Sequence, residues 1–137
     1  MNDVVVLDNN ILVSSIFWEK GHSHKIVDLA IEQKIINFTS PEMLNELSKV
    51  LRVKFRLPED NIERQLALVA NYSQIIQPKI KLKVIKEDPK DDKVLECALE
   101  CNADYIVTGD KRHLLKLQQF KGIRIVTPKQ FLDLIRK

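Results

Sequence analysis

The chain has 137 residues, of which 45% are hydrophobic and 30% charged, and its 22 basic and 19 acidic residues give a formal net charge of +3. These values exclude a disordered chain and favour a single globular domain over residues 1–137. The apolar runs are too short to span a membrane, and no basic, cleavable leader opens the chain, so we expect a cytoplasmic protein without membrane contact. The small positive charge permits a nucleic-acid partner but is a weak indication of one.

The pattern of apolar residues predicts strands that alternate with helices. In chain order, the predicted elements are a strand at 4–7, a short helix or loop at 11–18, a helix from residue 23, a strand at 35–39, helices at 41–52 and 58–76, a strand at 82–85, a helix at 93–101, a strand at 105–107, a helix at 113–118, a strand at 123–126 and a helix at 128–137. Such alternation is typical of an α/β fold. We expect a three-layer α/β/α architecture around a central, mainly parallel sheet.

Asp8 follows the first predicted strand directly, in the tripeptide Asp8-Asn9-Asn10. A strand that is buried on both faces ends at the edge where α/β sheets bind ligands, which makes Asp8 a candidate for the floor of a polar site. The same tripeptide also suits a turn and a helix cap. The tripeptide alone does not decide between the two.

Helical phase selects one glutamate in the helix that follows Ser40-Pro41. At about 100° per residue, the apolar side chains of this helix form a stripe centred near Leu47. Glu46 lies on the border of that stripe, about 40° from Val50, whereas Glu42 lies roughly 140° from its centre. We therefore expect Glu46 to reach the site and Glu42 to face away. A boundary glutamate that extends into water is the alternative for Glu46.

The acidic turn at residues 88–92 can be treated in the same way. Extrapolated back from the helix predicted at 93–101, Asp91 falls within about 20° of the centre of the buried stripe, while Asp92 points roughly 120° away. Asp91 is therefore the better pocket residue. Asp92 is expected to cap the helix or to interact with its positive end, and Asp88 is expected to be a turn residue.

Asp110 follows Thr108-Gly109 directly after another predicted strand. Glycine permits a tight turn there, and the Thr108 hydroxyl can orient a carboxylate, although Asp110 also suits a cap of the next helix. Asp8, Asp91 and Asp110 all fall at strand ends or at the start of the following helix. In a doubly wound sheet these positions share one rim.

Several carboxylates that converge on one rim cannot all stay charged without a positive partner. Oxygen ligands favour Mg²⁺ or Mn²⁺ over zinc, and these ions activate water and neutralise the charge of a phosphodiester. Lys111 and Arg112, beside Asp110, are candidate phosphate-binding residues, although most such side chains are simply solvated. Cys97 and Cys101 lack the partners of a structural zinc site and are expected in the core.

Taken together, these motifs resemble a PIN domain, a compact metal-dependent nuclease fold common among bacterial and archaeal toxin–antitoxin ribonucleases. The resemblance spans nearly the whole chain. Within the family, the motifs of this chain are similar to those of the PIN subgroup of toxin components. Its four motifs are Leu7-Asp8-Asn9-Asn10, the segment 40–47 with Glu46, Asp91 followed by Val94-Leu95 and Ala98, and Val107-Thr108-Gly109-Asp110. Two residues depart from the pattern: Asn9 replaces the usual threonine or serine, and Lys90 stands where the subgroup often has another acid.

The resemblance implies a Mg²⁺- or Mn²⁺-dependent endoribonuclease that cleaves single-stranded or structured RNA with metal-activated water. The implied catalytic and metal-binding residues are Asp8, Glu46, Asp91 and Asp110. The residues expected to orient them are Asn10, Ser14, Asp92 and Thr108. The resemblance also implies a homodimer and a cognate antitoxin protein. The alternative is a catalytically weak PIN fold that binds RNA or a protein without cutting. Trp18 is its evident stacking candidate, although we rather expect Trp18 to be a core or interface residue.

Overall fold

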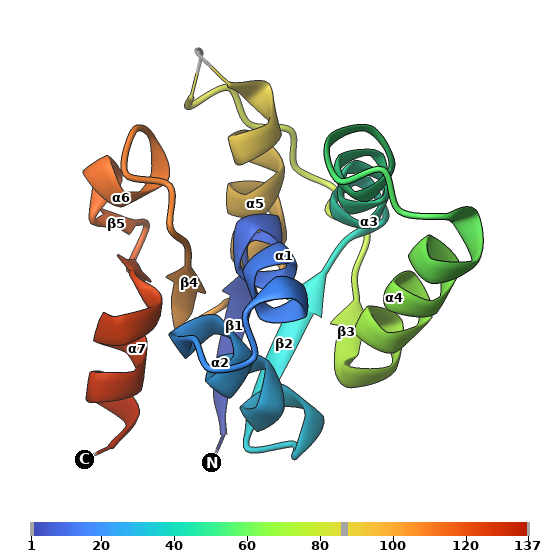
Figure 1. Ribbon diagram of the computed structural model, residues 1–137. Coiled ribbons are helices and arrows are strands. Elements are labelled where there is room, and N and C mark those ends of the chain that lie inside the picture. The colour runs from blue at the N-terminus through green and yellow to red at the C-terminus, as the bar shows by residue number, and fades with distance from the viewer. Residues whose placement is uncertain (1, 86–87, 137) are drawn as a thin grey trace.

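The computed structural model describes residues 2–85 and 88–136. In these ranges six strands form one sheet, in the order β3-β2-β1-β4-β6-β5, with helices on both faces (Figure 1). The strands are β1 (Asp3–Leu7), β2 (Ile35–Thr39), β3 (Ser73–Ile75), β4 (Tyr105–Val107), β5 (Gln119–Phe120) and β6 (Ile123–Val126). The helices are α1 (Asn9–Phe17), α2 (His22–Ile31), α3 (Pro41–Lys49), the π-helical turn η1 (Val50–Lys54), α4 (Glu59–Tyr72), α5 (Pro89–Glu100), α6 (Leu114–Leu117) and α7 (Pro128–Ile135). The predicted three-layer α/β fold is confirmed.

The sheet is parallel except at one edge. Strand β1 pairs in parallel with both β2 and β4, β2 pairs in parallel with β3, and β4 with β6, whereas the short β5 is antiparallel to β6. The chain therefore moves outward from β1 in one direction through β2 and β3, and in the other through β4 and β6. The carboxyl ends of β1 and β4 lie at this switch point, where α/β sheets open a crevice for ligands.

Two hydrophobic clusters share the sheet between them. Val5 and Leu7 of β1 pack on one face with residues of α1, α2, α4 and α7. Val6 packs on the other face with residues of α5 and α6. In Figure 1, α1 and α2 lie in front of the sheet and α5 lies behind it. Because β1 is covered on both faces, its end is held rigidly where Asp8 begins.

Local signals in the sequence set the helix starts at the site. The Ser40 hydroxyl accepts a hydrogen bond from the Met43 N–H at 3.2 Å, and Pro41 occupies the first turn, so α3 begins directly after β2. The Asp88 carboxylate accepts from the Lys90 N–H at 3.2 Å and begins α5 at Pro89. Helix α5 thus starts earlier than the predicted residue 93.

Two predictions for residues 58–85 are wrong. The helix expected at 58–76 ends at Tyr72, because residues 73–75 pair with β2 as strand β3. The strand expected at 82–85 is an extended segment outside the sheet.

Residues 79–85 are held by carboxylates of α5. The backbone N–H groups of Lys79 and Leu82 donate to Glu100 and Glu96, at 2.7 and 2.9 Å. Those of residues 84 and 85 both donate to Asp92, at 3.1 and 2.9 Å. The three acids lie four residues apart on one stripe of α5 and satisfy the backbone as a neighbouring strand would.

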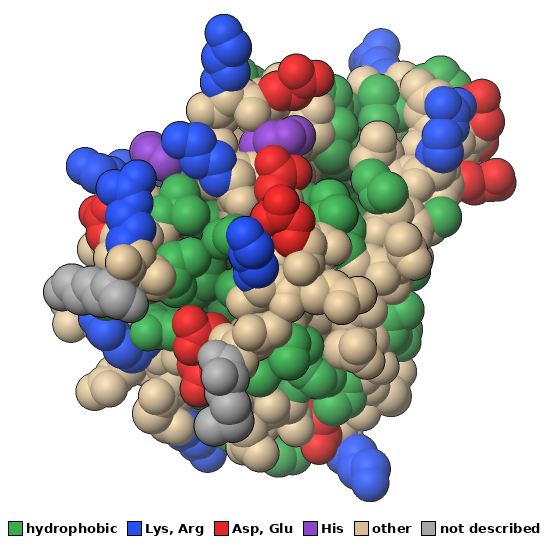
Figure 2. Space-filling model, turned by 90° about the horizontal axis from the view of Figure 1, so that it is seen from below, with side chains coloured by type: hydrophobic (Ala, Val, Ile, Leu, Met, Phe, Trp, Pro, Cys, Tyr) green, Lys and Arg blue, Asp and Glu red, His purple; other side chains and the backbone are tan. Residues whose placement is uncertain are grey.

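The amino-terminal ends of the strands, opposite the end where Asp8 lies, form a different surface. Figure 2 looks from below onto the amino-terminal ends of the strands, where hydrophobic side chains are exposed among charged ones. A hollow of about 740 Å³ lies there, with Ile31, Ile36 and Tyr72 in its lining. None of its lining residues is charged, so the acidic chemistry of the chain lies elsewhere. None of the helices in the described ranges has the length and apolarity that a bilayer crossing requires.

Candidate active site

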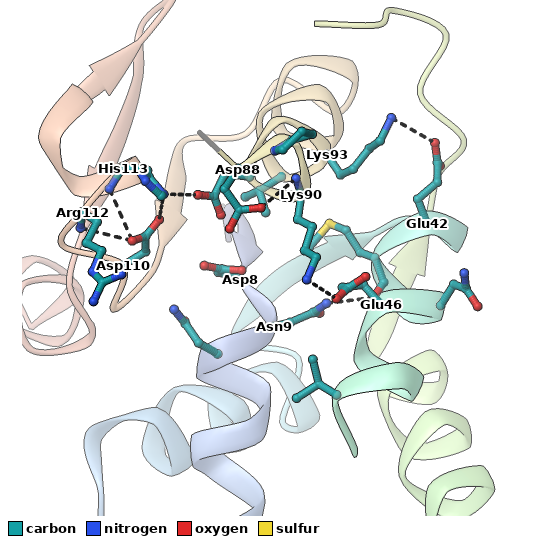
Figure 3. A pocket seen from close by; sticks show the side chains of 17 residues that line it. Asp8, Asn9, Glu42, Glu46, Asp88, Lys90, Lys93, Asp110, Arg112 and His113 are labelled. Atoms are coloured by element: carbon teal, nitrogen blue, oxygen red, sulfur yellow. Dashed lines mark hydrogen bonds and ion pairs between the residues drawn. The ribbon is translucent and has the colours of Figure 1, made fainter. Parts of the chain in front are cut away.

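A pocket of about 590 Å³ opens at the carboxyl ends of β1 and β4, between α3 and α5 (Figure 3). Its ionisable lining residues are Asp8, Glu42, Glu46, Asp88, Lys90, Asp91, Lys93, Asp110, Arg112 and His113. The four acids predicted from the sequence all line this pocket. Acidic side chains outnumber basic ones, so the site attracts cations.

Asp8 forms the floor of the pocket. Its residue is 9% exposed, and the Thr108 hydroxyl donates to its Oδ2 atom at 2.7 Å. Although Asp8 precedes α1, its side chain makes no capping hydrogen bond. Burial raises its pKa to about 6, helped by the charges of Asp110 and Asp88 and opposed by the Thr108 hydrogen bond. Asp8 is thus a buried carboxylate, and no basic side chain in the described ranges is among the groups that shift its pKa.

Asp91 projects from the first turn of α5 toward the same centre. Burial is the main cause that raises its pKa to about 7, followed by the hydrogen bond and charge of Asp110 and the charge of Asp8. His113 Nδ1 lies 3.0 Å from Asp91 Oδ2 and opposes this shift. Because the charges of Asp110 and Asp8 both raise the pKa of Asp91, the three carboxylates repel one another.

Asp110 serves as a cap and as a pocket residue at once. Its carboxylate accepts from the backbone N–H groups of Arg112, His113 and Leu114, at 3.1 to 3.3 Å. Burial works in the opposite direction, but these hydrogen bonds and the one shared with Asp91 hold the pKa of Asp110 below its usual value. Asp110 therefore stays ionised and repels the other carboxylates.

Two residues join the site that sequence reasoning did not place there, Asp88 and His113. Asp88, Asp91 and His113 each offer one ligand atom, and these atoms all lie within 4.8 Å of one another. His113 Nδ1 also lies 3.7 Å from Asp110 Oδ2. The available signal was spacing, because Asp88 precedes Asp91 by three residues and His113 follows Asp110 by three, about one helical turn in each case.

The α3 wall carries both glutamates considered from the sequence. Glu46 is 24% exposed, and its Oε1 atom lies 3.1 Å from Lys90 Nζ. Glu42, expected to face away, also lines the pocket, and its Oε2 atom lies 3.1 Å from Lys81 Nζ. Residues 79–85 run along α5, so the ion pair with Lys81 holds Glu42 toward α5. A helical wheel of α3 alone cannot show this contact.

The predicted orienting and phosphate-binding residues separate into two groups. Thr108 holds Asp8, as described, and Asn10 Oδ1 accepts from the Gly109 N–H at 3.3 Å, which fixes the loop after β4. Arg112 lines the pocket. Three other predicted residues do not line the pocket. Ser14 and Lys111 lie outside it, and the Asp92 carboxylate instead accepts hydrogen bonds from the backbone of residues 84 and 85.

The residues present fit a divalent cation. Carboxylate oxygens suit Mg²⁺ or Mn²⁺, and the cluster of Asp88, Asp91 and His113 is compact enough to supply three ligand atoms. Asn9 Nδ2 donates to the Met43 carbonyl at 2.8 Å, whereas its buried Oδ1 atom has no partner in the described part of the chain. Raised carboxyl pKa values and an unused oxygen are features that a bound cation would compensate.

Comparisons with known proteins agree with this geometry. A family model for the PIN domain matches residues 4–112. The uncharacterized protein MJ1680 of Methanocaldococcus jannaschii is 34% identical over 145 residues, which cover 97% of this chain and 92% of that protein.

Two solved structures share the fold. One is VapBC2 from Rickettsia felis, in a crystal structure bound to a DNA fragment from their promoter, with a TM-score of 0.63, 18% identity, and coverage of 90% of this chain and 98% of that chain. The other is PAE2754 from Pyrobaculum aerophilum, with a TM-score of 0.60, 16% identity, and coverage of 98% of this chain and 90% of that chain. At these identities the likeness concerns the fold alone. Since the family model runs from β1 through Asp110, this chain belongs to the PIN domain family.

Proposed function

We propose that this PIN domain is a divalent-metal-dependent endoribonuclease and the toxin component of a toxin–antitoxin pair. The observation that carries the proposal is the meeting of Asp8, Asp91 and Asp110 in one pocket, from elements far apart in the sequence. Two of these carboxyls have pKa values raised to about 6 and about 7. Acids that repel one another in this way are poised to bind a cation.

Each pocket residue has a proposed part in the reaction. Asp8, Asp91 and Asp110 would hold Mg²⁺ or Mn²⁺, with Asp88, His113 and Glu46 available to complete the set. The bound ion supplies Lewis acidity, which lowers the pKa of water and neutralises phosphodiester charge. Thr108 keeps the Asp8 carboxylate in one orientation through its 2.7 Å hydrogen bond.

The remaining residues act on water and substrate. Glu46, on the α3 wall, accepts a hydrogen bond from the attacking water and orients it. Arg112, on the opposite wall beside Asp110, binds a phosphate of the RNA. Cleavage of the P–O3′ bond leaves a 5′-phosphate and a 3′-hydroxyl, as the PIN resemblance implies.

The toxin assignment rests on the PIN family and on the fold shared with VapBC2 of Rickettsia felis. We infer a homodimer and an antitoxin partner for this chain by analogy with that system. Co-expression with the product of a neighbouring gene tests the pairing. Suppression of RNA cleavage in the co-purified complex supports it, and undiminished cleavage contradicts it.

The central experiment compares wild type with Asp8→Asn on a labelled single-stranded RNA, with Mn²⁺, with Mg²⁺ or with EDTA. We expect metal-dependent cleavage by the wild type and a loss of at least about a hundredfold in the variant, since asparagine keeps the shape but not the charge. Asp28→Asn is the control, because Asp28 is 53% exposed on α2. Full activity of Asp8→Asn, or cleavage unaffected by EDTA, would overturn the proposal.

A second candidate function is binding of RNA without cleavage. It is favoured by Trp18, which is 59% exposed at the end of α1 and packs edge-on against Phe17. Phe17 in turn stacks on Phe55, with ring centroids 4.6 Å apart, so the indole is supported as a stacking platform. Under this function, RNA binds equally well in EDTA, stays intact with Mn²⁺, and binds more weakly to Trp18→Ala.

A further inference from the structure

Lys90 and Glu46 connect the two walls of the pocket. Lys90 lies in the first turn of α5 and Glu46 lies on α3, and Lys90 Nζ is 3.1 Å from Glu46 Oε1 (Figure 3). The Lys90 side chain is 66% exposed, whereas that of Glu46 is 24% exposed. The ion pair therefore spans the pocket, and its cationic member is the more exposed one.

The ammonium of Lys90 lies in the field of the acidic centre. Its nearest anion is Glu46 Oε1, 3.1 Å away, and Asp88 and Asp91 lie two positions before it and one after it in the chain. As a lysine, Lys90 carries a positive charge at neutral pH beside the proposed metal ligands.

The proposed function requires Glu46 to act on water or metal, yet its Oε1 atom is engaged by Lys90 in the free protein. Lys90 can leave without backbone movement. The Asp88 cap fixes the Lys90 N–H, while four side-chain bonds remain free to turn toward solvent. Once a cation binds Glu46 and the neighbouring acids, their attraction for the ammonium weakens, and the Lys90 side chain is free to contact another anion.

A second cation lies on the opposite side of the acids. In Figure 3, Arg112 and Lys90 stand on either side of Asp8 and Asp88. Lys93, the other lysine of the lining, lies 3.4 Å from the buried Glu96 and 3.9 Å from Glu42. Lys90 and Arg112 are therefore placed to contact a polyanion that crosses the acidic centre.

We propose that Lys90 is a substrate-binding residue, which neutralises Glu46 in the free protein and moves to a phosphate of single-stranded RNA when metal and substrate enter. This inference rests on the proposed nuclease function. Lys90 then contributes to substrate affinity, and its ion pair keeps Glu46 neutralised until metal and RNA bind. Removal of Lys90 should then change RNA binding and metal binding in opposite directions.

The test compares Lys90→Met with Lys81→Met. Lys81 is a close match, because its Nζ atom also lies 3.1 Å from a glutamate of α3, Glu42, and its side chain is 62% exposed. Lys81 lies outside the pocket lining. RNA affinity is measured by fluorescence anisotropy of a labelled single-stranded oligoribonucleotide in Ca²⁺, with the RNA checked for integrity. Mn²⁺ affinity is measured by calorimetry without RNA.

For Lys90→Met we expect RNA binding weaker on the order of tenfold, with a salt slope smaller by about 0.7, the value for one phosphate contact on a single strand. Mn²⁺ should bind more tightly than to wild type, because Glu46 loses a competing cation. Lys81→Met should resemble wild type in both measurements. Unchanged RNA affinity in Lys90→Met, an equal loss in Lys81→Met, or weaker Mn²⁺ binding in Lys90→Met would overturn the inference.

The two hypotheses fail in different ways. If the wild type neither binds Mn²⁺ nor cleaves RNA, the proposed function fails and the Lys90 inference with it. If the wild type does both and Asp8→Asn abolishes both, the nuclease proposal stands. An RNA affinity of Lys90→Met equal to wild type then refutes the inference about Lys90 alone.

Discussion

Replacement of Asp8 by asparagine should make the metal-free protein more stable at pH 8. Asp8 is 9% exposed and its pKa is raised from the usual 3.8 to about 6, chiefly by burial. Ionised Asp8 therefore costs folding free energy in the absence of a metal. Asparagine has the same shape, can accept the hydrogen bond from Thr108, and carries no charge.

The magnitude follows from linkage between protonation and folding. Between the two pKa values the native state binds more protons than the unfolded state, so the contribution of Asp8 is fully present below about 3.8 and is lost as the pH rises through about 6. A shift of this size corresponds to about 3 kcal/mol at pH 8 and roughly half of that at pH 5. The stability advantage of Asp8→Asn should therefore shrink as the pH falls.

Urea denaturation in EDTA at pH 5 and pH 8 measures this advantage, with Asp28→Asn as the surface control. Mn²⁺ at about 100 times its Kd should then stabilise the wild type by about 2.7 kcal/mol and leave Asp8→Asn unchanged. The stability advantage of Asp8→Asn over the wild type should thus shrink or change sign when metal is added. A variant that is less stable than the wild type in EDTA at pH 8 would refute the reasoning.

Two further substitutions test the buried interior of the protein outside the pocket. Glu96→Ala should cost about 2 kcal/mol in urea denaturation, because Glu96 is 1% exposed and accepts the Leu82 N–H, whereas Glu100→Ala, near the surface, should cost less than about 1 kcal/mol. Equal losses would contradict this. Phe131→Ala should cost about 3–5 kcal/mol in the same assay, because Phe131 is fully buried and packs edge-on against Tyr105. A loss below about 1 kcal/mol would show that this core region repacks.

Helical phase indicated which side chains of α3 and α5 face the pocket, and it misplaced one of them. Glu46 and Asp91 were selected from their neighbours by the buried stripes of their own helices, and both line the pocket. Glu42 lines it as well, against the prediction. Its position depends on Lys81, a contact between residues 39 positions apart, and a single-helix wheel contains no such contact.

Strand assignment failed at residues 82–85 for a similar reason. Leu82 and Ile85 are apolar and contribute to a core cluster, a pattern that suits a strand. Whether an extended segment joins a sheet depends on which groups satisfy its N–H donors. Here the carboxylates of Asp92 and Glu96 do so, which local sequence could not reveal.

The sequence by itself determined the alternation of strands and helices, the parallel sheet, and the placement of Asp8, Asp91 and Asp110 at its carboxyl edge. These features follow from apolar periodicity and from residues adjacent along the chain. Only the tertiary structure decided that Thr108 holds Asp8 across 100 positions, that Asp88 and His113 join the acidic cluster, and that Lys90 pairs with Glu46. These are contacts between separate elements, and their energies depend on distance and burial, which the order of residues does not specify.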